Sequence, residues 1–337
     1  MSDIIISENF SGPWIDGLKQ DFSVQHEPEL WRSPAKLKAL VPSCRALLVR
    51  NQTRVTAEIV EAAGRLEVIG RSGAGLDNIH VPAATAAGVV VVSTPDQNSI
   101  SVAELTLGMM LALARKLPEA CGHTREGGWE RHRFVGTELY GKTLGIVGLG
   151  RIGFLLALRA RALGMDIVAH DLYVNPDSVA VTESGAELVT LDDLLARSDF
   201  VSCHVPLTAQ TKHFFGYEQL CGMKPGAFFL NLARGEVVEE EGLIAALREK
   251  RLAGAGLDVR EQEPPGSGPL GDFDNVILTP HIAAFTREAQ ERVIAAVCQD
   301  VRAVLTGRPA KNFANFSKPK PKPSPLPSGE VLLSTPS

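Results

Sequence analysis

Short apolar runs alternate with segments of helical spacing along most of the chain. The runs, each a candidate β-strand, are Asp3–Ser7, Ala46–Val49, Leu66–Gly70, Val89–Val92, Thr143–Val147, Asp166–Ala169, Phe200–His204, Ala227–Leu230, Gly254–Leu257 and Val276–Thr279. Between them, segments such as Phe154–Leu163, Leu191–Arg197 and Glu240–Lys250 place apolar residues at helical intervals. Apolar strands that alternate with helices are typical of parallel sheets covered on both faces. The pattern therefore predicts an α/β protein built from doubly wound units.

The strands outnumber those of a single doubly wound sheet, so we expect two such domains. Residues 101–286 form one, and residues 1–100 together with 287–316 form the other. Two long helices, Ser99–Leu117 and Thr286–Leu305, would connect them. After Phe316 proline alternates with lysine and serine, a composition that favours extended chain over a packed core. We therefore expect residues 317–337 to be a disordered tail.

Composition narrows the class of protein. The chain has 337 residues, of which 45% are hydrophobic and 22% charged, and a net charge of −5, which argues against nucleic acid as a partner. Its five cysteines form no CxxC motif, so we expect neither disulfides nor a metal site. The N-terminus lacks the features of a signal peptide, and the longest apolar stretch, residues 102–114, is shorter than the about 20 residues of a membrane span. A cytoplasmic protein without a membrane partner is the expectation.

One glycine-rich turn has the context of a Rossmann dinucleotide site. An apolar strand leads into Gly148, Gly150 and Gly153, and a helix follows. In this arrangement the first glycine permits a tight turn, the second lets the backbone approach a pyrophosphate, and the third lets helix and strand pack closely. The next strand leads to Asp171, 18 residues beyond Gly153, near the usual position of the acid that binds the ribose hydroxyls. A carboxylate repels a 2′-phosphate and no arginine follows it, so NAD is predicted rather than NADP. A structural turn with a surface aspartate is the alternative interpretation.

A related turn, residues 70–77, follows the strand Leu66–Gly70 in the first part of the chain. Backbone amides at Ser72, Gly73 and Ala74 could hold an acid group, because successive N–H groups in a turn form a concavity that binds anions. A purely structural turn explains the same residues equally well.

Polar residues follow three later strands. Arg234 comes after the apolar run that ends at Leu230, Glu263 after the run that ends at Leu257, and His281 after the run that ends at Thr279. Parallel strands end at one edge of a sheet, so we expect these side chains to converge. Arginine can grip a substrate carboxylate, histidine can exchange a proton near neutral pH, and a carboxylate can orient the histidine. Hydride transfer at a 2-hydroxy acid needs these groups, although each residue alone also fits an ordinary turn or loop.

Asp258, at the end of the same strand as Glu263, has two possible roles. It could orient His281 in place of Glu263. We prefer it as a contact to the nicotinamide side of the cofactor.

At this point the ordered motifs resemble those of one family, the D-isomer-specific 2-hydroxyacid dehydrogenases. They span about residues 40–310 and read GRSGAGLDNI, NSISVAELTLGMMLALAR, GGWERHRFVGTELYGKTLGIVGLGRIG, CHVPLT, NLARGEVVEEEGLIAAL, GLDVREQEPP and TPHIAAFT. The resemblance implies a flavodoxin-like substrate domain beside the NAD-binding Rossmann domain, and chemistry on an R-configured 2-hydroxy acid or the 2-keto acid. It also implies a homodimer formed through the cofactor domains, in which the arm Trp129–Leu139 reaches the other subunit.

The resemblance also assigns residues. The family's catalytic arginine, glutamate and histidine fall on Arg234, Glu263 and His281. Its NAD contacts fall on Ala74, Arg151, Ile152, Asp171, Val205, Leu232, Ala233, Arg234, Asp258 and His281.

The substrate is less sharply indicated. The chain resembles most closely the members that act on 3-phosphoglycerate, in which additional arginines bind the phosphate. The residues expected to bind substrate are Arg50, Arg71, Ser72, Gly73 and Arg234, with Arg54, Arg131 and Arg133 as further candidates. Each added arginine also fits charged surface. Phe285 stands where close relatives carry a small residue, which puts 3-phosphoglycerate itself in question.

Other functions fit the same motifs. No segment resembles the serine-binding regulatory domain of longer family members, so we do not expect control through such a domain. A hydroxypyruvate or glyoxylate reductase, or a dehydrogenase of a sulfonated or phosphonated lactate, is the alternative within the enzyme class. Outside that class, an NAD-sensing corepressor is the alternative.

Overall fold

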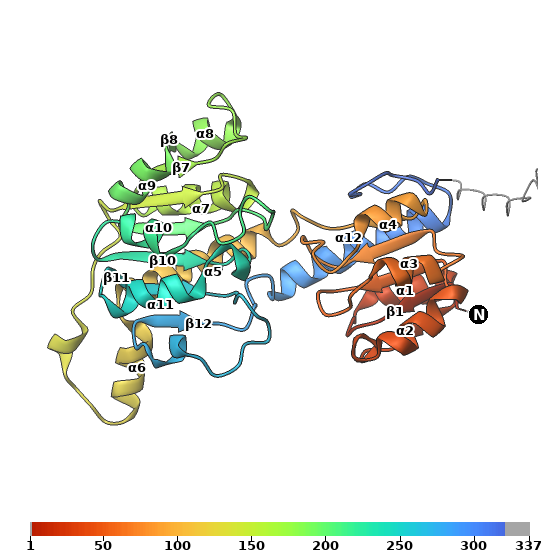
Figure 1. The fold of residues 1–337 in the computed structure, drawn as a ribbon, viewed down its shortest axis with the longest axis horizontal. Helices are drawn as coiled ribbons and strands as arrows, with labels where there is room; N and C mark the ends of the chain where they lie inside the picture. Colours follow the sequence, from red (N-terminus) through yellow and green to blue (C-terminus); the bar gives the residue numbers. More distant parts are fainter. Residues whose placement is uncertain (1, 321–337) are drawn as a thin grey trace, which may run out of the picture. The chain divides into compact units, whose positions relative to one another are not determined.

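The computed structural model describes residues 2–320, which divide into two compact units. Among the described residues, the first unit comprises residues 2–98 and 290–320, and the second comprises Ser99–Ala289 (Figure 1). Because the chain enters the second unit once and leaves it once, the first unit is built from both ends of the sequence.

The first unit contains one parallel sheet. Its strands are β1 (Ile4–Ile6), β2 (Val24–His26), β3 (Ala46–Val49), β4 (Val68–Arg71) and β5 (Val90–Val92), in the order β2-β1-β3-β4-β5. Its helices are α1 (Pro13–Asp21), α2 (Pro34–Leu40), α3 (Ala57–Ala62), α4 (Val81–Ala86) and α12 (Arg287–Leu305), with 3-10 turns η1 (Leu30–Arg32) and η2 (Val41–Ser43). Numbered along the chain, the order 2-1-3-4-5 is that of flavodoxin-like folds.

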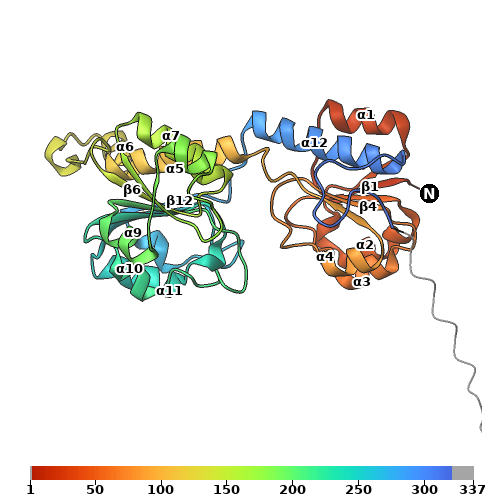
Figure 2. The ribbon, with the colours of Figure 1, turned by 90° about the horizontal axis from the view of Figure 1, so that it is seen from above.

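Helices cover both faces of this sheet. Figure 2 shows α1 and α12 on one face and α2, α3 and α4 on the other. The alternate residues of each strand enter two separate cores, so Ile4 and Ile6 pack beneath α12 while Ile5 packs on the opposite side. Burial on both faces explains why these strands read as continuous apolar runs.

The second unit contains a larger parallel sheet. Its strands are β6 (Thr143–Val147), β7 (Asp166–His170), β8 (Glu187–Leu188), β9 (Phe200–Cys203), β10 (Ala227–Asn231), β11 (Leu252–Leu257) and β12 (Val276–Leu278), in the order β12-β11-β10-β9-β6-β7-β8. This order reverses direction between β6 and β9. Ligands of open α/β sheets bind at such a point, outside the carboxyl ends of the strands.

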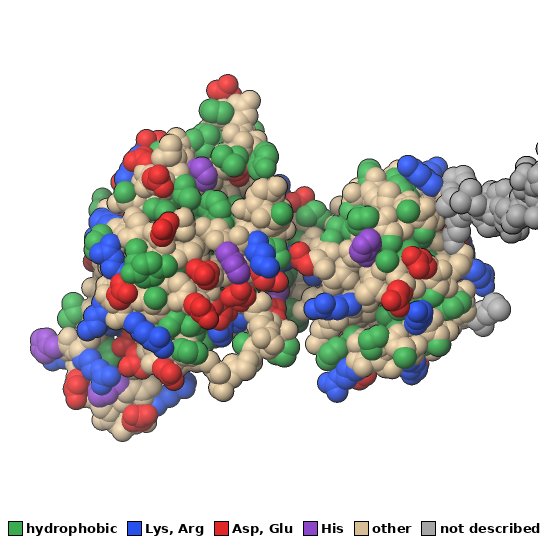
Figure 3. Space-filling view, viewed as in Figure 1, with side chains coloured by type: hydrophobic (Ala, Val, Ile, Leu, Met, Phe, Trp, Pro, Cys, Tyr) green, Lys and Arg blue, Asp and Glu red, His purple; other side chains and the backbone are tan. Residues whose placement is uncertain are grey.

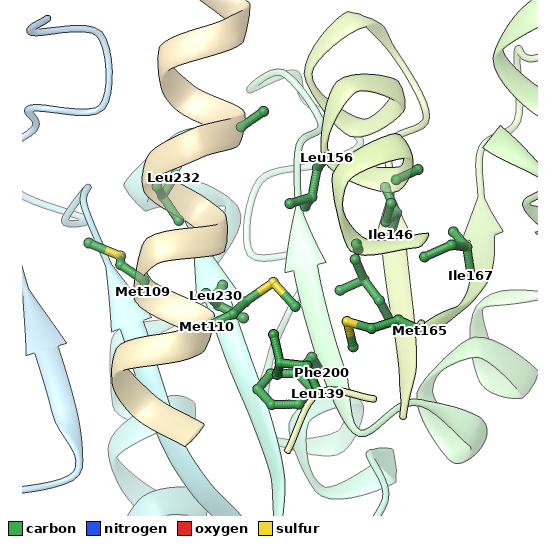
Figure 4. Packing of buried hydrophobic residues seen from close by; sticks show 14 of the residues in the cluster. Met109, Met110, Leu139, Ile146, Leu156, Met165, Ile167, Phe200, Leu230 and Leu232 are labelled. Atoms are coloured by element: carbon green, nitrogen blue, oxygen red, sulfur yellow. The ribbon is translucent and has the colours of Figure 1, made fainter. Parts of the chain in front are cut away.

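Two layers of helices enclose this second sheet. The helices are α5 (Ser99–Ala114), α6 (Leu117–Arg125), α7 (Arg151–Ala162), α8 (Val179–Ser184), α9 (Leu191–Arg197), α10 (Tyr217–Gly222) and α11 (Glu240–Arg248), with 3-10 turns η3 (Arg131–Phe134), η4 (Gly235–Val237) and η5 (Pro269–Asp272). Methionines of α5 pack over the sheet, and Met110 points toward the buried Phe200 and Leu230 (Figure 4). This packing fixes the strands whose carboxyl ends carry the predicted site.

Some element boundaries differ from those predicted. Strands β2 and β8 were not predicted, because each is a short edge strand with few apolar residues. The helix expected over Ser99–Leu117 ends at Ala114, since Lys116 has a left-handed φ of 50° and a new helix begins at Leu117, with Pro118 in its first turn.

The predicted start of the tail, residue 317, lies too early in the chain. Ala310 donates its backbone N–H to the carbonyl of Ser317, and Lys320 donates to the carbonyl of Gly88. Residues 317–320 therefore belong to the first unit, whereas residues 321–337 lie outside the described part. Within residues 2–320, no helix is both long and apolar enough to cross a membrane.

Candidate active site

The predicted residues of the second unit lie at the carboxyl edge of its sheet. Val205 follows β9, Arg234 follows β10, Asp258 follows β11 and His281 follows β12. These four strands are consecutive neighbours in the sheet. The topology therefore brings together segments that are up to 76 residues apart in the sequence (281 − 205).

His281 and Glu263 form a direct pair. The Nδ1 atom of His281 lies 2.7 Å from Oε2 of Glu263, and both side chains are about one-third exposed. Burial by itself raises the pKa of Glu263, but the hydrogen bond and charge of His281, the backbone N–H of Arg260 and the charge of Arg234 outweigh it and hold that pKa below its ordinary value. Glu263 is therefore ionised near neutral pH and oriented toward the histidine.

Asp258 organises the loop that carries His281. Its carboxylate, which is buried, accepts the backbone N–H groups of Ile282 and Ala283 at 2.8 Å each and the hydroxyl of Thr279 at 2.5 Å. Its backbone carbonyl accepts the N–H of His281 at 2.8 Å. These bonds hold His281 at a left-handed φ of 55°, a conformation that non-glycine residues rarely adopt. The structure thus gives Asp258 a role in orienting His281 through the backbone, while the preferred nicotinamide contact stays a prediction.

Arg234 is positioned by a residue that the sequence reading missed. Asn231, buried at the end of β10, donates its side-chain N–H to the carbonyl of Arg234 at 2.9 Å and accepts the N–H of Ala233 at 3.1 Å. The Arg234 guanidinium donates to the carbonyl of Ala233 at 2.7 Å. A polar residue at the end of an otherwise buried strand was the only sequence signal for Asn231.

The glycine-rich turn has the geometry that a pyrophosphate requires. Gly148 has a φ of 96°, and a β-carbon there would lie 2.9 Å from the backbone of His204. A β-carbon at Gly153 would lie 2.4 Å from the carbonyl oxygen of Gly148, so helix α7 packs directly on the turn. A β-carbon at Gly150, which caps α7, would meet nothing within 4 Å. The protein thus leaves open the space in front of the helix N-terminus where a phosphate binds.

Asp171 lies beside this turn. Its carboxylate accepts the N–H of Leu149 at 2.9 Å and, through its other oxygen, the N–H groups of Tyr173 and Val174 at 2.8 and 3.2 Å. An ionised carboxylate has about four acceptor positions, so it can still accept ribose hydroxyls. Of the other expected NAD contacts, Ile152 is half-buried in α7, Arg151 is exposed, and Leu232 and Ala233 lie in the loop that follows β10.

A further histidine at this edge, His204, had no assigned role in the sequence. Its Nε2 atom lies 2.9 Å from the hydroxyl of Ser202, while its Nδ1 atom is buried with no partner among the described residues. Burial lowers the pKa of His204 to about 4, so the ring is neutral at physiological pH. Its backbone packs closely against Gly148, where a β-carbon would lie only 2.9 Å away, so His204 is in direct contact with the glycine-rich turn.

In the first unit, the turn after β4 differs from the expected anion cradle. The N–H of Ser72 is donated to the carbonyl of Val49, and that of Gly73 to the hydroxyl of Thr94. Two of the three amides proposed to hold an acid are therefore already used, which corrects that part of the prediction. The Ser72 hydroxyl is buried without a partner among the described residues, and the Arg71 side chain lies over Gly73, where a β-carbon would be 1.5 Å from Nη1.

Arg50 is held within the first unit by several contacts. Its backbone N–H is donated to the buried carboxylate of Glu8 at 2.8 Å, and its guanidinium donates to the carbonyl of Asn9 at 3.1 Å and to the side chain of Gln290. Burial lowers the pKa of Arg50. Arg54, Arg131 and Arg133 are exposed, as is Phe285, with 57% of its surface accessible.

One pocket in the second unit lies away from these residues. It measures about 470 Å³ and is lined by Leu113, Val135, Phe200, Phe228 and Ile277, among others. Phe200, Phe228 and Ile277 lie at or near the amino ends of β9, β10 and β12, so the pocket is at the opposite edge of the sheet from His281.

Comparison with known proteins identifies the chain's relatives. Residues 107–283 match the model of the D-isomer specific 2-hydroxyacid dehydrogenase, NAD binding domain. The chain belongs to this family. The match confirms the family inferred from the motifs, and the two parallel sheets confirm the fold class. It also confirms NAD as the cofactor of the second unit, with which the open space at Gly150 agrees.

Individual relatives show how far the similarity extends. A D-3-phosphoglycerate dehydrogenase from Synechocystis is 43% identical over 94% of this chain, although the chain spans only 56% of that relative. The structure of the TT0316 protein from Thermus thermophilus is 35% identical, with a TM-score of 0.86 over 92% of this chain and 99% of that one. That of a D-lactate dehydrogenase from Aquifex aeolicus, complexed with NAD and lactic acid, is 28% identical, with a TM-score of 0.84 over 93% and 98%. The chain thus spans about half of its curated relative and nearly all of the solved structures.

Proposed function

We propose that this chain is an NAD-dependent dehydrogenase that interconverts an R-configured 2-hydroxy acid and its 2-keto acid. The observation that carries the proposal is the 2.7 Å pair of His281 and Glu263, which lies at the same strand edge as Arg234 and the nucleotide turn. A family match alone gives the fold and the cofactor, whereas this pair supplies a base with a fixed orientation.

Each residue of the site has a distinct task. Because Nδ1 of His281 faces Glu263, its Nε2 is the nitrogen that takes the hydroxyl proton during oxidation and returns it during reduction. The ionised Glu263 stabilises the imidazolium that forms. Arg234 binds the substrate carboxylate and polarises the carbonyl. NAD, when bound, supplies the acceptor or donor of the hydride at C2.

A panel of acids tests this proposal. NADH absorbance is followed with 3-phosphoglycerate, sulfolactate, phosphonolactate, D-lactate and D-glycerate as donors, and with hydroxypyruvate and glyoxylate as acceptors. Turnover of at least one acid, lost in His281→Ala while NADH binding is retained, is the expected result. Tight NADH binding without turnover of any acid would instead favour the NAD-sensing alternative.

We further propose that the substrate carries a second anionic group, with 3-phosphoglycerate as the leading candidate. Support comes from the D-3-phosphoglycerate dehydrogenase relative and from Arg71, whose side chain lies over a turn in which the buried Ser72 hydroxyl has no partner within residues 2–320. An Arg71→Met variant should raise the KM for a phosphorylated acid much more than the KM for D-lactate. Equal effects on both acids would exclude a role in binding the second anion.

We also propose that the protein is a homodimer formed through its second unit. Within residues 117–138, a segment that includes all of the arm Trp129–Leu139 except its last residue, no residue is buried, and Trp129 is 78% exposed. Figure 1 shows α6 and the adjoining loop projecting from the body of this unit. Exposed large apolar side chains on a projecting segment are typical of an interaction surface.

A further inference from the structure

The loop that carries Glu263 is held by an ion pair outside the site described above. Arg260, three residues before Glu263, donates from Nε and Nη2 to the two carboxylate oxygens of Glu240 at 2.9 and 2.8 Å. Their side chains are only 12% and 21% exposed. A bidentate pair with so little exposure is stronger and more rigid than a surface salt bridge.

The same carboxylate also fixes the loop backbone. Oε1 of Glu240 accepts the N–H of Glu261 at 2.8 Å, and Glu240 is the first residue of helix α11. Glu240 therefore holds both the side chain of one loop residue and the backbone of the next.

Two further contacts restrict the loop from other sides. Oε1 of Glu261 lies 2.7 Å from Nε2 of His213. The loop backbone packs on Gly235, where a β-carbon would lie only 1.8 Å from the carbonyl oxygen of Arg260. Because Gly235 directly follows Arg234, the Glu263 loop and the Arg234 loop cannot shift independently.

A continuous path connects this ion pair to the catalytic base. Arg260 donates its backbone N–H to Oε1 of Glu263 at 3.1 Å, and the other oxygen of Glu263 faces His281. Loss of the Glu240–Arg260 pair would free the residue that orients one oxygen of Glu263, and the other oxygen would lose its fixed direction toward the imidazole.

We propose that Glu240 and Arg260 are positioning residues for the Glu263–His281 pair. This inference rests on the proposed function, since it assumes that His281 carries the proton. The charged groups around the loop are Arg234 on the side of Glu263, and His213 and Glu261 on the side of Glu240.

The test uses Glu240→Gln and Arg260→Met, singly and together, in the full chain. A displacement of catalytic groups by about 1 Å costs up to about a hundredfold in rate, so each single variant should lower kcat by about ten- to a hundredfold. NADH affinity should stay within about twofold, since the nucleotide turn is not touched. The double variant should be no worse than either single variant, because both remove the same contact.

A pH profile separates positioning from general structural damage. With Glu263 displaced, the imidazolium is less stabilised, so the acidic limb of the profile for oxidation should move to lower pH in Glu240→Gln. Arg197→Met is the matched control, since Arg197 forms a surface bidentate pair with Glu187 in the same unit. An unshifted profile, or a rate equal to that of Arg197→Met, would overturn the inference.

A different observation would show that the proposed function, rather than the positioning role, is wrong. If the wild-type chain oxidises or reduces no acid in the panel, the proposed function is wrong. The NMR titration of His281 in ¹³C-histidine-labelled protein then decides the inference, since Glu240→Gln should shift it and Arg197→Met should not. Identical titration curves in wild type and Glu240→Gln would exclude a positioning role.

Discussion

Asn231 and Asp258 stabilise the catalytic loops in the same way, by hydrogen bonds from a buried side chain to the loop backbone. Each is a buried polar side chain at the end of a strand, and each hydrogen-bonds to the backbone of the next few residues or of a neighbouring loop. Loss of either side chain would leave buried backbone groups without partners, at a cost of about 1–3 kcal/mol. The sequence predicts Arg234, Glu263 and His281 because parallel strands share one edge. It does not predict these backbone contacts, because they depend on loop conformations that no periodicity specifies.

The role of Asp171 is tested by cofactor preference. Asp171→Ala removes the acceptor proposed for the ribose hydroxyls and the charge that repels a 2′-phosphate. Hydrogen bonds to charged groups are worth about 1.5–3 kcal/mol, so the KM for NADH should rise by about ten- to a hundredfold while that for NADPH changes less. Steady-state kinetics with both cofactors measures this, with Asp177→Ala as a control on an exposed aspartate nearby. An unchanged preference for NADH over NADPH would exclude the ribose contact.

We expect His204 to make the stability of the fold depend on pH. Burial lowers its pKa to about 4, whereas the unfolded chain protonates near 6.5, so protonation favours unfolding as the pH falls from about 6.5 toward 4. Between pH 7 and pH 5 the wild type should lose about 2 kcal/mol more than His204→Gln in the free energy of unfolding. Urea titrations at the two pH values measure the difference. Equal losses in both proteins would contradict a neutral buried His204.

At the scale of elements, the apolar runs predict the inner strands well and the edges poorly. Ile4–Ile6 and Val90–Val92 are buried throughout, and their entirely apolar, β-branched composition predicts a buried strand. Glu187–Leu188 pairs only with β7 at the edge of its sheet, so its residues need not be apolar. Edge strands and helix breaks such as Lys116 are decided by tertiary contacts, which a local pattern does not contain.

Two glycines of one turn should respond oppositely to the same substitution. Gly153→Ala places a methyl group 2.4 Å from the carbonyl oxygen of Gly148, and such overpacking costs about 1–3 kcal/mol, so Tm should fall. Gly150→Ala meets no protein atom within 4 Å, so Tm should stay near that of the wild type. Its methyl group would occupy the space of the pyrophosphate and raise the Kd for NADH by about tenfold, or about 1.4 kcal/mol. Thermal unfolding and NADH fluorescence titration measure both effects. An unchanged Kd in Gly150→Ala would contradict the phosphate position.

At the scale of the whole molecule, the sheet topology determines which residues that are distant in the sequence lie near one another. Alternating strands and helices predict two doubly wound sheets, and the sequence motifs predict a Rossmann turn in one of them. The order β12-β11-β10-β9-β6-β7-β8 then places His281 and Arg234 on the carboxyl side of strands on one flank of the turn and Asp171 on the other. Figure 3 shows acidic and basic side chains interspersed on the visible face of the second unit, with no large field of one sign.

The arm provides the last prediction, which concerns assembly. Trp129 is exposed on a segment with no buried residue, and a homodimer would cover it. Trp129→Glu should shift the protein from twice the mass of one chain to that of a single chain in sedimentation velocity, because a charge cannot be buried in an apolar interface without a partner. Trp14→Glu is the matched control, since Trp14 is also exposed but lies on α1 of the first unit. A wild-type protein that sediments as a single chain, or a dimer that survives Trp129→Glu, would show that the arm does not join two copies.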